Sequence, residues 1–465
     1  MAVLLATHWS YLGLPYYWDE LGFFIPAAHD LFRAGLLAPQ STPPEVHPPL
    51  VMLYLAASWK LFGFSAPVTR VAMLVVGAGT VAAAYALGRR LSTPPAAAWT
   101  AVLLLVSPPF VAQSMLAHLD LAAAMWTLAA LCWFLDRRWR LCGLALTLLV
   151  LTKETAVVVP LALAVTAGKD RRPRWPLLLP VLALGAWVGY LRAVTGHWAG
   201  NPEFASYNVA GALEAGRSGL ALLRRLYQLG ISNFHWVAAL LVLAGRRALA
   251  GPGWRACGAI VAAYLALHSV LGGALLLRYL LPALALLYLA AATAGAALRP
   301  VWRNAALAGL AAGLAISNWW NPPYPFSYED NLAVVDFIAL EQQAAGFVSE
   351  HLPGKVVTTA WPLTDALTNP LAGYVSRPIQ VRAVENFQPL SWATLRADDV
   401  EVVAIYSRSW EPEGGWQTWA PAARLLETYF GYRAQIRPQE LIQRLGLRRL
   451  ARWERRGQWM EILAR

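Results

Sequence analysis

Residues 277–297 read LRYLLPALALLYLAAATAGAA, a stretch in which Arg278 is the only charged residue. A helix of about 20 apolar residues crosses the hydrocarbon core of a bilayer. The chain as a whole has the same character, because 58% of its 465 residues are hydrophobic, 14% are charged and the mean hydropathy is +0.45. This composition excludes an ordinary soluble enzyme and a disordered protein. It predicts a polytopic α-helical membrane protein.

Ten further apolar stretches bring the predicted number of transmembrane helices to about 11. They are residues 2–15, 66–88, 97–113, 119–135, 141–152, 155–168, 175–194, 233–245, 256–272 and 303–318. No basic residue precedes the apolar N-terminal stretch, so we interpret it as a short or truncated span and not as a cleaved signal peptide. Residues 47–63 are also apolar, but a crossing there would put Arg89 and Arg90 on the outer side. We therefore expect them to form a helix in the outer membrane interface.

The connections between these stretches sort by charge, because fourteen basic residues occupy every second one. They are Arg89, Arg90, Arg137, Arg138, Arg140, Lys169, Arg171, Arg172, Arg174, Arg246, Arg247, Arg255, Arg299 and Arg303. The positive-inside rule places them in the cytoplasm and predicts a multi-pass protein of the plasma (inner) membrane. Asp136 and Asp170 then lie inside as well. The other acids of the apolar part fall outside: Asp19, Glu20, Asp30, Glu45, Asp120, Glu154, Glu203 and Glu214.

The end of the chain differs in composition from the apolar part. Residues 321–325 read NPPYP and predict a linker between a membrane domain, residues 1–320, and a C-terminal domain, residues 321–465. Periodicity and turn residues predict helices at 332–352 and 421–429, strands at 355–360 and 400–406, and a hairpin of 447–454 with 459–463. This pattern indicates a small α/β domain, which the charge rule places outside, in the periplasm. Its seven tryptophans either stack on sugars or pack its core.

The first external loop contains the sequence Tyr16-Tyr17-Trp18-Asp19-Glu20. Two adjacent carboxylates in different surroundings can divide the work, one accepting a proton while the other orients or binds. The alternative is structural: Asp19 would be the N-cap of a helix over residues 20–36, with Trp18 in the aromatic belt of the membrane.

Three further external junctions supply polar residues. They read His47-Pro48-Pro49-Leu50, His118-Leu119-Asp120-Leu121 and Thr152-Lys153-Glu154-Thr155. Charged residues at the edge of apolar segments are costly to bury, so they indicate a functional site. Together the junctions predict a site that binds an anionic substrate and removes a proton. Asp19 and Asp120 from separate loops are weak evidence for a metal, and the three cysteines lack zinc spacing, so we predict neither a metal nor another cofactor.

These motifs resemble those of the GT-C glycosyltransferases, in particular the group of protein O-mannosyltransferases and aminoarabinose lipid A transferases. The resemblance rests on Tyr17-Trp18-Asp19-Glu20, His47-Pro48-Pro49-Leu50, Leu119-Asp120, Leu151-Thr152-Lys153-Glu154 and Arg278-Tyr279-Leu280-Leu281-Pro282, in that order. It implies a GT-C-like membrane fold and the transfer of a sugar from undecaprenyl or dolichyl phosphate on the non-cytoplasmic face. It also implies that Asp19 is the base, that Glu20 supports it, and that Asp120 is the second acidic position.

Such a donor carries its own leaving group, a phosphate, so the enzyme needs a base, cations for the phosphate and an apolar groove. Lys153 and Arg278 lie at the external ends of spans and are the predicted phosphate-binding cations, although Arg278 alone also fits an interfacial arginine. His47, Glu154 and Tyr279 are predicted to support the site. Inversion at the anomeric carbon is what the resemblance implies.

The expected partners are a polyprenyl-phosphate-linked sugar, a lipid, glycan or protein acceptor, and the bilayer, with no nucleic acid. No nucleotide-binding motif is present. The alternative function is a lipid or polysaccharide transporter or flippase, which predicts paired internal repeats that we do not find. Residues 195–232 are expected to be a long external loop that covers the donor site, in which Arg224 and Arg225 contact lipid headgroups or solvent.

Overall fold

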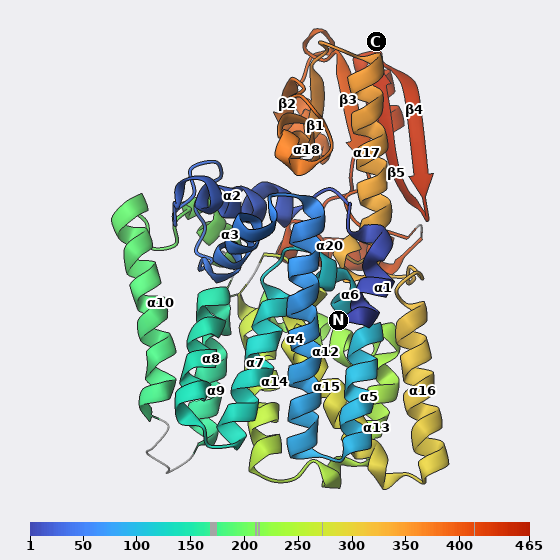
Figure 1. Cartoon of the computed structure of the whole chain (residues 1–465). Coiled ribbons are helices and arrows are strands. Elements are labelled where there is room, and N and C mark those ends of the chain that lie inside the picture. Colours follow the sequence, from blue (N-terminus) through green and yellow to red (C-terminus); the bar gives the residue numbers. More distant parts are fainter. Residues whose placement is uncertain (168–173, 210–211, 213, 272, 413) are drawn as a thin grey trace. The chain divides into compact units, whose positions relative to one another are not determined.

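The computed structural model describes residues 1–167, 174–209, 212, 214–271, 273–412 and 414–465 (Figure 1). They form two compact units. The helical unit consists of Met1–Trp9 and Pro26–Trp320, and the sheet unit consists of Ser10–Ile25 and Asn321–Arg465. The predicted cytoplasmic residues Lys169, Asp170, Arg171 and Arg172 lie outside the described residues.

Three helical stretches in the described part of the chain are long and apolar enough to cross a membrane: Ala66–Leu91, Trp175–Thr195 and Leu277–Ala297. The number rises to five if each of two bent helix pairs is one span. The predicted number of about 11 spans therefore stays a prediction. The first of the three is α4 (Ala66–Leu91), the second lies in α10 (Arg174–Thr195), and the third centres on α15 (Leu281–Ala294). Twelve of the fourteen residues of α15 are buried, so this helix lies at the centre of the unit.

The remaining helices of the helical unit have the following bounds: α1 (Ala2–His8), α2 (Ile25–Ala34), α3 (Leu50–Phe62), α5 (Pro94–Val106), α6 (Pro108–Met115), α7 (Asp120–Leu135), α8 (Trp139–Thr152), α9 (Val158–Thr166), α11 (Pro202–Val209), α12 (Ala215–Gly230), α13 (His235–Ala244), α14 (Pro252–Val270) and α16 (Pro300–Ile316). In Figure 1, α4, α7 and α8 lie side by side, and the contacts between them agree. The helix predicted in the outer interface at residues 47–63 corresponds to α3.

The structure departs from two sequence expectations about these helices. The predicted span at residues 97–113 is broken into α5 and α6, which are bent by 64°. The break falls at Ser107, whose backbone is extended (ψ 126°), because the proline that follows disfavours helical geometry at the preceding residue. The predicted first span at residues 2–15 ends its α-helix at His8.

The expected long loop at residues 195–232 instead contains α11 and α12. The buried residues of α12 are Arg217, Ala221, Arg225 and Gln228, whereas the exposed ones include Leu222, Leu223 and Leu226, Leu223 being 63% exposed. Polar residues facing the bundle and apolar residues facing away are typical of a membrane protein. A search for an apolar buried face therefore misses this helix.

The sheet unit contains a five-stranded sheet with the order β2-β1-β3-β5-β4. The strands are β1 (Val357–Ala360), β2 (Val381–Val384), β3 (Val402–Tyr406), β4 (Arg448–Arg455) and β5 (Gln458–Ala464). β1 pairs in parallel with β2 and β3, whereas β5 is antiparallel to β3 and β4. β2 was not predicted, because this short edge strand alternates weakly and both of its central residues are exposed.

The long helix α17 (Ala333–His351) contacts β4 and β5 and supplies much of the core of the sheet unit (Figure 1). The smaller helices are α18 (Leu363–Thr368), α19 (Pro389–Ala393), α20 (Ala420–Phe430) and α21 (Pro438–Leu445). The N-terminal segment Ser10–Ile25 belongs to this unit. The segment that carries Asp19 and Glu20 is thus held by the C-terminal part of the chain.

Candidate active site

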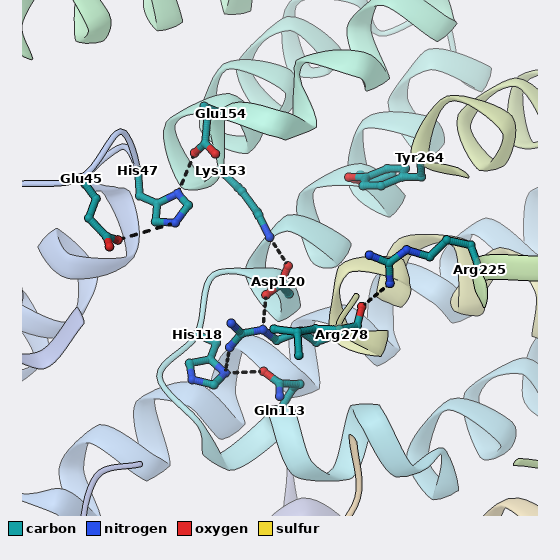
Figure 2. A network of polar contacts seen from close by, with 12 residues as sticks. Glu45, His47, Gln113, His118, Asp120, Lys153, Glu154, Arg225, Tyr264 and Arg278 are labelled. Atoms are coloured by element: carbon teal, nitrogen blue, oxygen red, sulfur yellow. Dashed lines mark hydrogen bonds and ion pairs between the residues drawn. The ribbon is translucent and has the colours of Figure 1, made fainter. Parts of the chain in front are cut away.

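Three of the predicted site residues meet in the helical unit. The Lys153 Nζ lies 2.6 Å from the Asp120 Oδ1, and the Arg278 Nε lies 3.4 Å from the Asp120 Oδ2. Figure 2 shows the two cations reaching the carboxylate from different elements. All three residues are buried, with 8%, 5% and 3% exposure for Lys153, Asp120 and Arg278. Charges at this depth require paired partners, and this cluster provides them.

The ends of three elements bring these side chains together. Asp120 is the first residue of α7, where the helix dipole favours a negative charge. α8 ends at Thr152, and Lys153 follows in an extended conformation (φ −150°, ψ 122°). Arg278 lies in the short helix η6 (Leu277–Leu280), directly before α15.

Tyr279 forms the wall beside these cations. Its ring centroid lies 4.0 Å from the Lys153 Nζ, 5.5 Å from the Arg278 Cζ and 5.8 Å from the Arg225 Cζ. The negative face of an aromatic ring attracts cations at such distances. The group formed by Asp120, Lys153, Arg225 and Arg278 carries three positive charges and one negative charge. This arrangement is suited to an anion.

His118 touches the cluster through Arg278. The Nδ1 of His118 lies 2.5 Å from the Arg278 Nη1 and 2.8 Å from the Gln113 Oε1. A guanidinium group only donates hydrogen bonds, so the Nδ1 accepts from Arg278 when it carries no proton, whereas the Gln113 Oε1 only accepts, so a protonated Nδ1 donates to it. The two hydrogen bonds therefore belong to different protonation states of the Nδ1.

Glu154, which follows Lys153 in the sequence, forms a second pair with His47. The Nδ1 of His47 lies 2.8 Å from the Glu154 Oε2, and its Nε2 lies 3.8 Å from the Glu45 Oε2 (Figure 2). Burial disfavours the charged imidazole, but the Glu154 carboxylate outweighs burial, so the pKa of His47 is raised above its usual value. The pair ties the loop before α3 to the turn that holds Lys153.

Several residues of this cluster were not predicted from the sequence. Arg225, expected to contact lipid or solvent, is fully buried and donates from its Nη1 to the Leu276 carbonyl at 2.7 Å. The His268 ring stacks on Tyr279 with a centroid distance of 5.2 Å, and Tyr264 stacks on His268. A charged residue within an apolar stretch is the signal that would have found Arg225.

Asp19 and Glu20 lie in the sheet unit. Glu20 is fully buried and accepts a hydrogen bond from the Tyr17 backbone at 2.9 Å. Asp19 occupies the N-cap position of the π-helix η2 (Glu20–Phe24), as the structural alternative expects, but its side chain makes no capping hydrogen bond. Trp18 has a φ of +48°, a backbone conformation that costs a side-chain-bearing residue about 1 kcal/mol or more. Strain of this kind clusters at functional sites.

The structure thus brings Asp120, Lys153, Arg278 and Tyr279 into one cluster and pairs His47 with Glu154. Asp19 and Glu20 belong to the other unit. Within the described ranges, no group of three or more His, Cys, Asp or Glu side chains could hold a metal ion.

Comparison with known proteins gives one family match. Residues 46–196 match the family model of the dolichyl-phosphate-mannose-protein mannosyltransferases. This range includes His47, Asp120, Lys153 and Glu154. No curated protein sequence matches the chain.

Solved structures show where the fold occurs. The chain is similar to ArnT from Cupriavidus metallidurans bound to undecaprenyl phosphate, with a TM-score of 0.60 and 15% identity over 99% of this chain and 96% of that chain. ArnT in the apo state gives a TM-score of 0.58 and 14% identity over the same shares. This likeness shows the fold, that of a polytopic helical membrane protein. With the family match, it confirms the predicted resemblance to the GT-C glycosyltransferases and the predicted enzyme class.

Proposed function

We propose that the chain is a glycosyltransferase of the GT-C type, which transfers a sugar from a polyprenyl-phosphate donor to an acceptor on the non-cytoplasmic side of the membrane. The observation that carries this proposal is the excess of buried cations around Asp120. A buried excess of positive charge binds a phosphate group strongly, because little water competes with the contact. The structure of ArnT with undecaprenyl phosphate supports a lipid phosphate as the ligand.

Lys153 and Arg278 are the proposed ligands of the donor phosphate. Arginine can bind phosphate with two parallel hydrogen bonds, and lysine contributes a compact charge. Asp120 contacts both cations and holds them in place between turnovers. Tyr279 supports the same two side chains through its ring, and His47 and Glu154 hold the turn of Lys153 from the other side.

The proposed reaction is a single displacement. The acceptor hydroxyl oxygen attacks the anomeric carbon of the sugar, the bond from that carbon to the phosphate oxygen breaks, and polyprenyl phosphate leaves with the electron pair. The acceptor proton passes to the Asp19 carboxylate, and the configuration at the anomeric carbon inverts. A well-placed base contributes a factor of about 10²–10⁴ to the rate. Lys153 and Arg278 stabilise the negative charge that grows on the leaving phosphate.

Glu20 is the proposed support of Asp19. Its carboxylate accepts the Tyr17 amide and so closes the short turn that contains Asp19. Glu20 is fully buried, which suits a residue that shapes this turn.

A donor panel tests this function. Purified protein in detergent is incubated with radiolabelled sugars on synthetic polyprenyl phosphates, and released or transferred sugar is measured. We expect turnover of one donor, and we expect Asp19→Asn to reduce it by about 10²–10⁴ because the general base is lost. Glu203→Gln, which removes an exposed acid from α11, is the matched control and should retain activity. Full activity of Asp19→Asn would remove Asp19 from the role of base, and no turnover of any donor would favour the transporter alternative.

A further inference from the structure

We infer that Glu341 and Tyr374 of the sheet unit are positioning residues for the segment that carries Asp19, and that they act through a hydrogen-bond chain in which Glu341 is protonated. The catalytic meaning of the segment rests on the function proposed above. The hydrogen-bond chain itself rests only on the geometry of the sheet unit.

The backbone of Tyr16 is held from both sides by one loop of the sheet unit. The Tyr16 amide donates to the Ala372 carbonyl at 3.1 Å. The Tyr16 carbonyl accepts from the Tyr374 hydroxyl at 3.0 Å. Tyr16 is buried and lies three residues before Asp19. A shift of this anchor therefore moves the backbone that presents Asp19.

The Tyr374 hydroxyl decides the protonation of Glu341. It lies 3.0 Å from the Tyr16 carbonyl oxygen and 2.8 Å from the Glu341 Oε2. A hydroxyl carries a single proton, and a carbonyl oxygen can only accept. If Tyr374 donates to the carbonyl, its oxygen must accept from Glu341. The chain is then complete only when the Glu341 carboxyl carries a proton: Glu341 donates to Tyr374, and Tyr374 donates to Tyr16.

The surroundings of Glu341 agree with a neutral carboxyl. The residue is fully buried on α17, and in the part of the chain that the structure describes its Oε1 has no hydrogen-bond partner. A buried carboxylate without a cation or several donors is costly. Burial raises the pKa of Glu341 to about 8, although the hydrogen bond that Tyr374 can donate to the ionised carboxylate opposes the shift. At neutral pH the protonated form therefore predominates.

The two tyrosines coupled to Glu341 do not account for a change near pH 8. Tyr17 and Tyr406 are electrostatically coupled to Glu341, and burial raises the pKa of both well above its usual value. The charged residues on the elements that pack against α17 are Glu329 and Asp330 on the short helix η8 (Tyr328–Asp330), Asp365 on α18, and Arg448, Arg449, Arg452, Glu454, Arg455 and Glu461 on β4 and β5. Glu461 is paired with both Arg449 and Arg452. Asp365 accepts from the Trp361 indole at 3.1 Å.

Two variants distinguish a role of the Glu341 proton in the hydrogen-bond chain from a purely structural role of the Glu341 side chain. Glu341→Gln replaces the acid proton by an amide N–H, which donates to Tyr374 at every pH. Tyr374→Phe removes the hydroxyl that connects Glu341 to the Tyr16 carbonyl. Glu350→Gln, an exposed residue of the same helix, is the matched control. Amide hydrogen exchange of residues 10–25 is measured at pH 7 and pH 9, with all variants compared at the same pH so that intrinsic exchange rates cancel.

At pH 7 we expect the amides of residues 10–25 to exchange about as fast in the wild type as in Glu341→Gln. At pH 9 we expect them to exchange about tenfold faster in the wild type than in this variant, because a carboxyl with a pKa near 8 loses most of its protons in this range. Glu350→Gln should follow the wild type, and Tyr374→Phe should exchange fast at both pH values. The transfer rate should show the same alkaline loss in kcat, with the donor KM unchanged, and Glu341→Gln should abolish that loss. Equal pH dependence in wild type and Glu341→Gln would overturn the inference. Exchange does not require activity, so this failure is distinct from inactivity of the enzyme.

Discussion

The two units each bury a carboxyl group, and they treat it in opposite ways. In the helical unit, Asp120 lies against Lys153 at 2.6 Å and Arg278 at 3.4 Å. In the sheet unit, Glu341 shares a hydrogen bond with the uncharged Tyr374. Both carboxyls are nearly inaccessible to water, with 5% and 0% exposure. Burial therefore does not decide the charge of a carboxyl; its partners do, and each unit uses the resulting state for a different task.

We propose that the charged cluster around Asp120 holds an anion, whereas the hydrogen bond between neutral Glu341 and Tyr374 holds the backbone of Tyr16. Removing a partner from the charged cluster leaves a buried charge uncompensated. Removing the proton from the Glu341 carboxyl adds a buried charge. The comparison predicts that substitutions with the same chemical change, acid to amide, have opposite consequences in the two units.

The largest effect is expected for Asp120→Asn. This substitution leaves Lys153 and Arg278 buried without their shared carboxylate, and loss of one member of a buried pair costs about 3–5 kcal/mol. The free energy of unfolding, measured in detergent, should fall by that order. Lys153→Met in the same chain should recover part of the loss, because it removes one of the stranded charges.

Asp136→Asn is the control for this prediction. It also breaks an ion pair, with Arg90 at 2.7 Å, but both side chains are about 30% exposed. Exposed pairs contribute about 0–1 kcal/mol. Equal losses of unfolding free energy in Asp120→Asn and Asp136→Asn would show that the buried cluster depends on its carboxylate no more than an exposed ion pair does.

A smaller effect of opposite sign is expected for Glu341→Gln. The folded-state pKa of Glu341 is about 8, above the usual value of 4.5, so its contribution to stability is fully present below 4.5 and is lost as the pH rises through 8. The unfolding temperature of the wild type should therefore fall by several degrees between pH 6 and pH 9. The amide variant cannot ionise and should fall less over the same range. A parallel decline in both proteins would mean that Glu341 does not control it.

The sequence predicts some of these features for clear physical reasons. The apolar stretches that form α4 and α15 follow from hydropathy alone, because a bilayer requires long apolar helices. Asp120, Lys153 and Arg278 could be selected because charges at the edges of such stretches are costly and need a purpose. Local sequence carries both signals.

Other features depend on contacts between distant residues. The burial of Arg225 was not predicted because α12 exposes leucines and buries cations, the reverse of the pattern expected for a helix of a soluble protein. The association of Ser10–Ile25 with the C-terminal part joins segments separated by 295 residues, which local periodicity does not reveal. Glu341 did carry a local signal, since it lies on the buried stripe of α17 together with Phe337, Ile338 and Val348.

Binding of undecaprenyl phosphate to purified wild type, Arg278→Gln and Arg255→Gln measures whether the cation cluster beside Asp120 binds a lipid phosphate. Hydrogen bonds to a charged group contribute about 1.5–3 kcal/mol, so Arg278→Gln should bind roughly 10- to 100-fold more weakly. Arg255→Gln changes an exposed arginine and should bind as the wild type does. The same affinity in all three proteins, with Arg278→Gln shown to be folded, would mean that Arg278 does not bind the lipid phosphate.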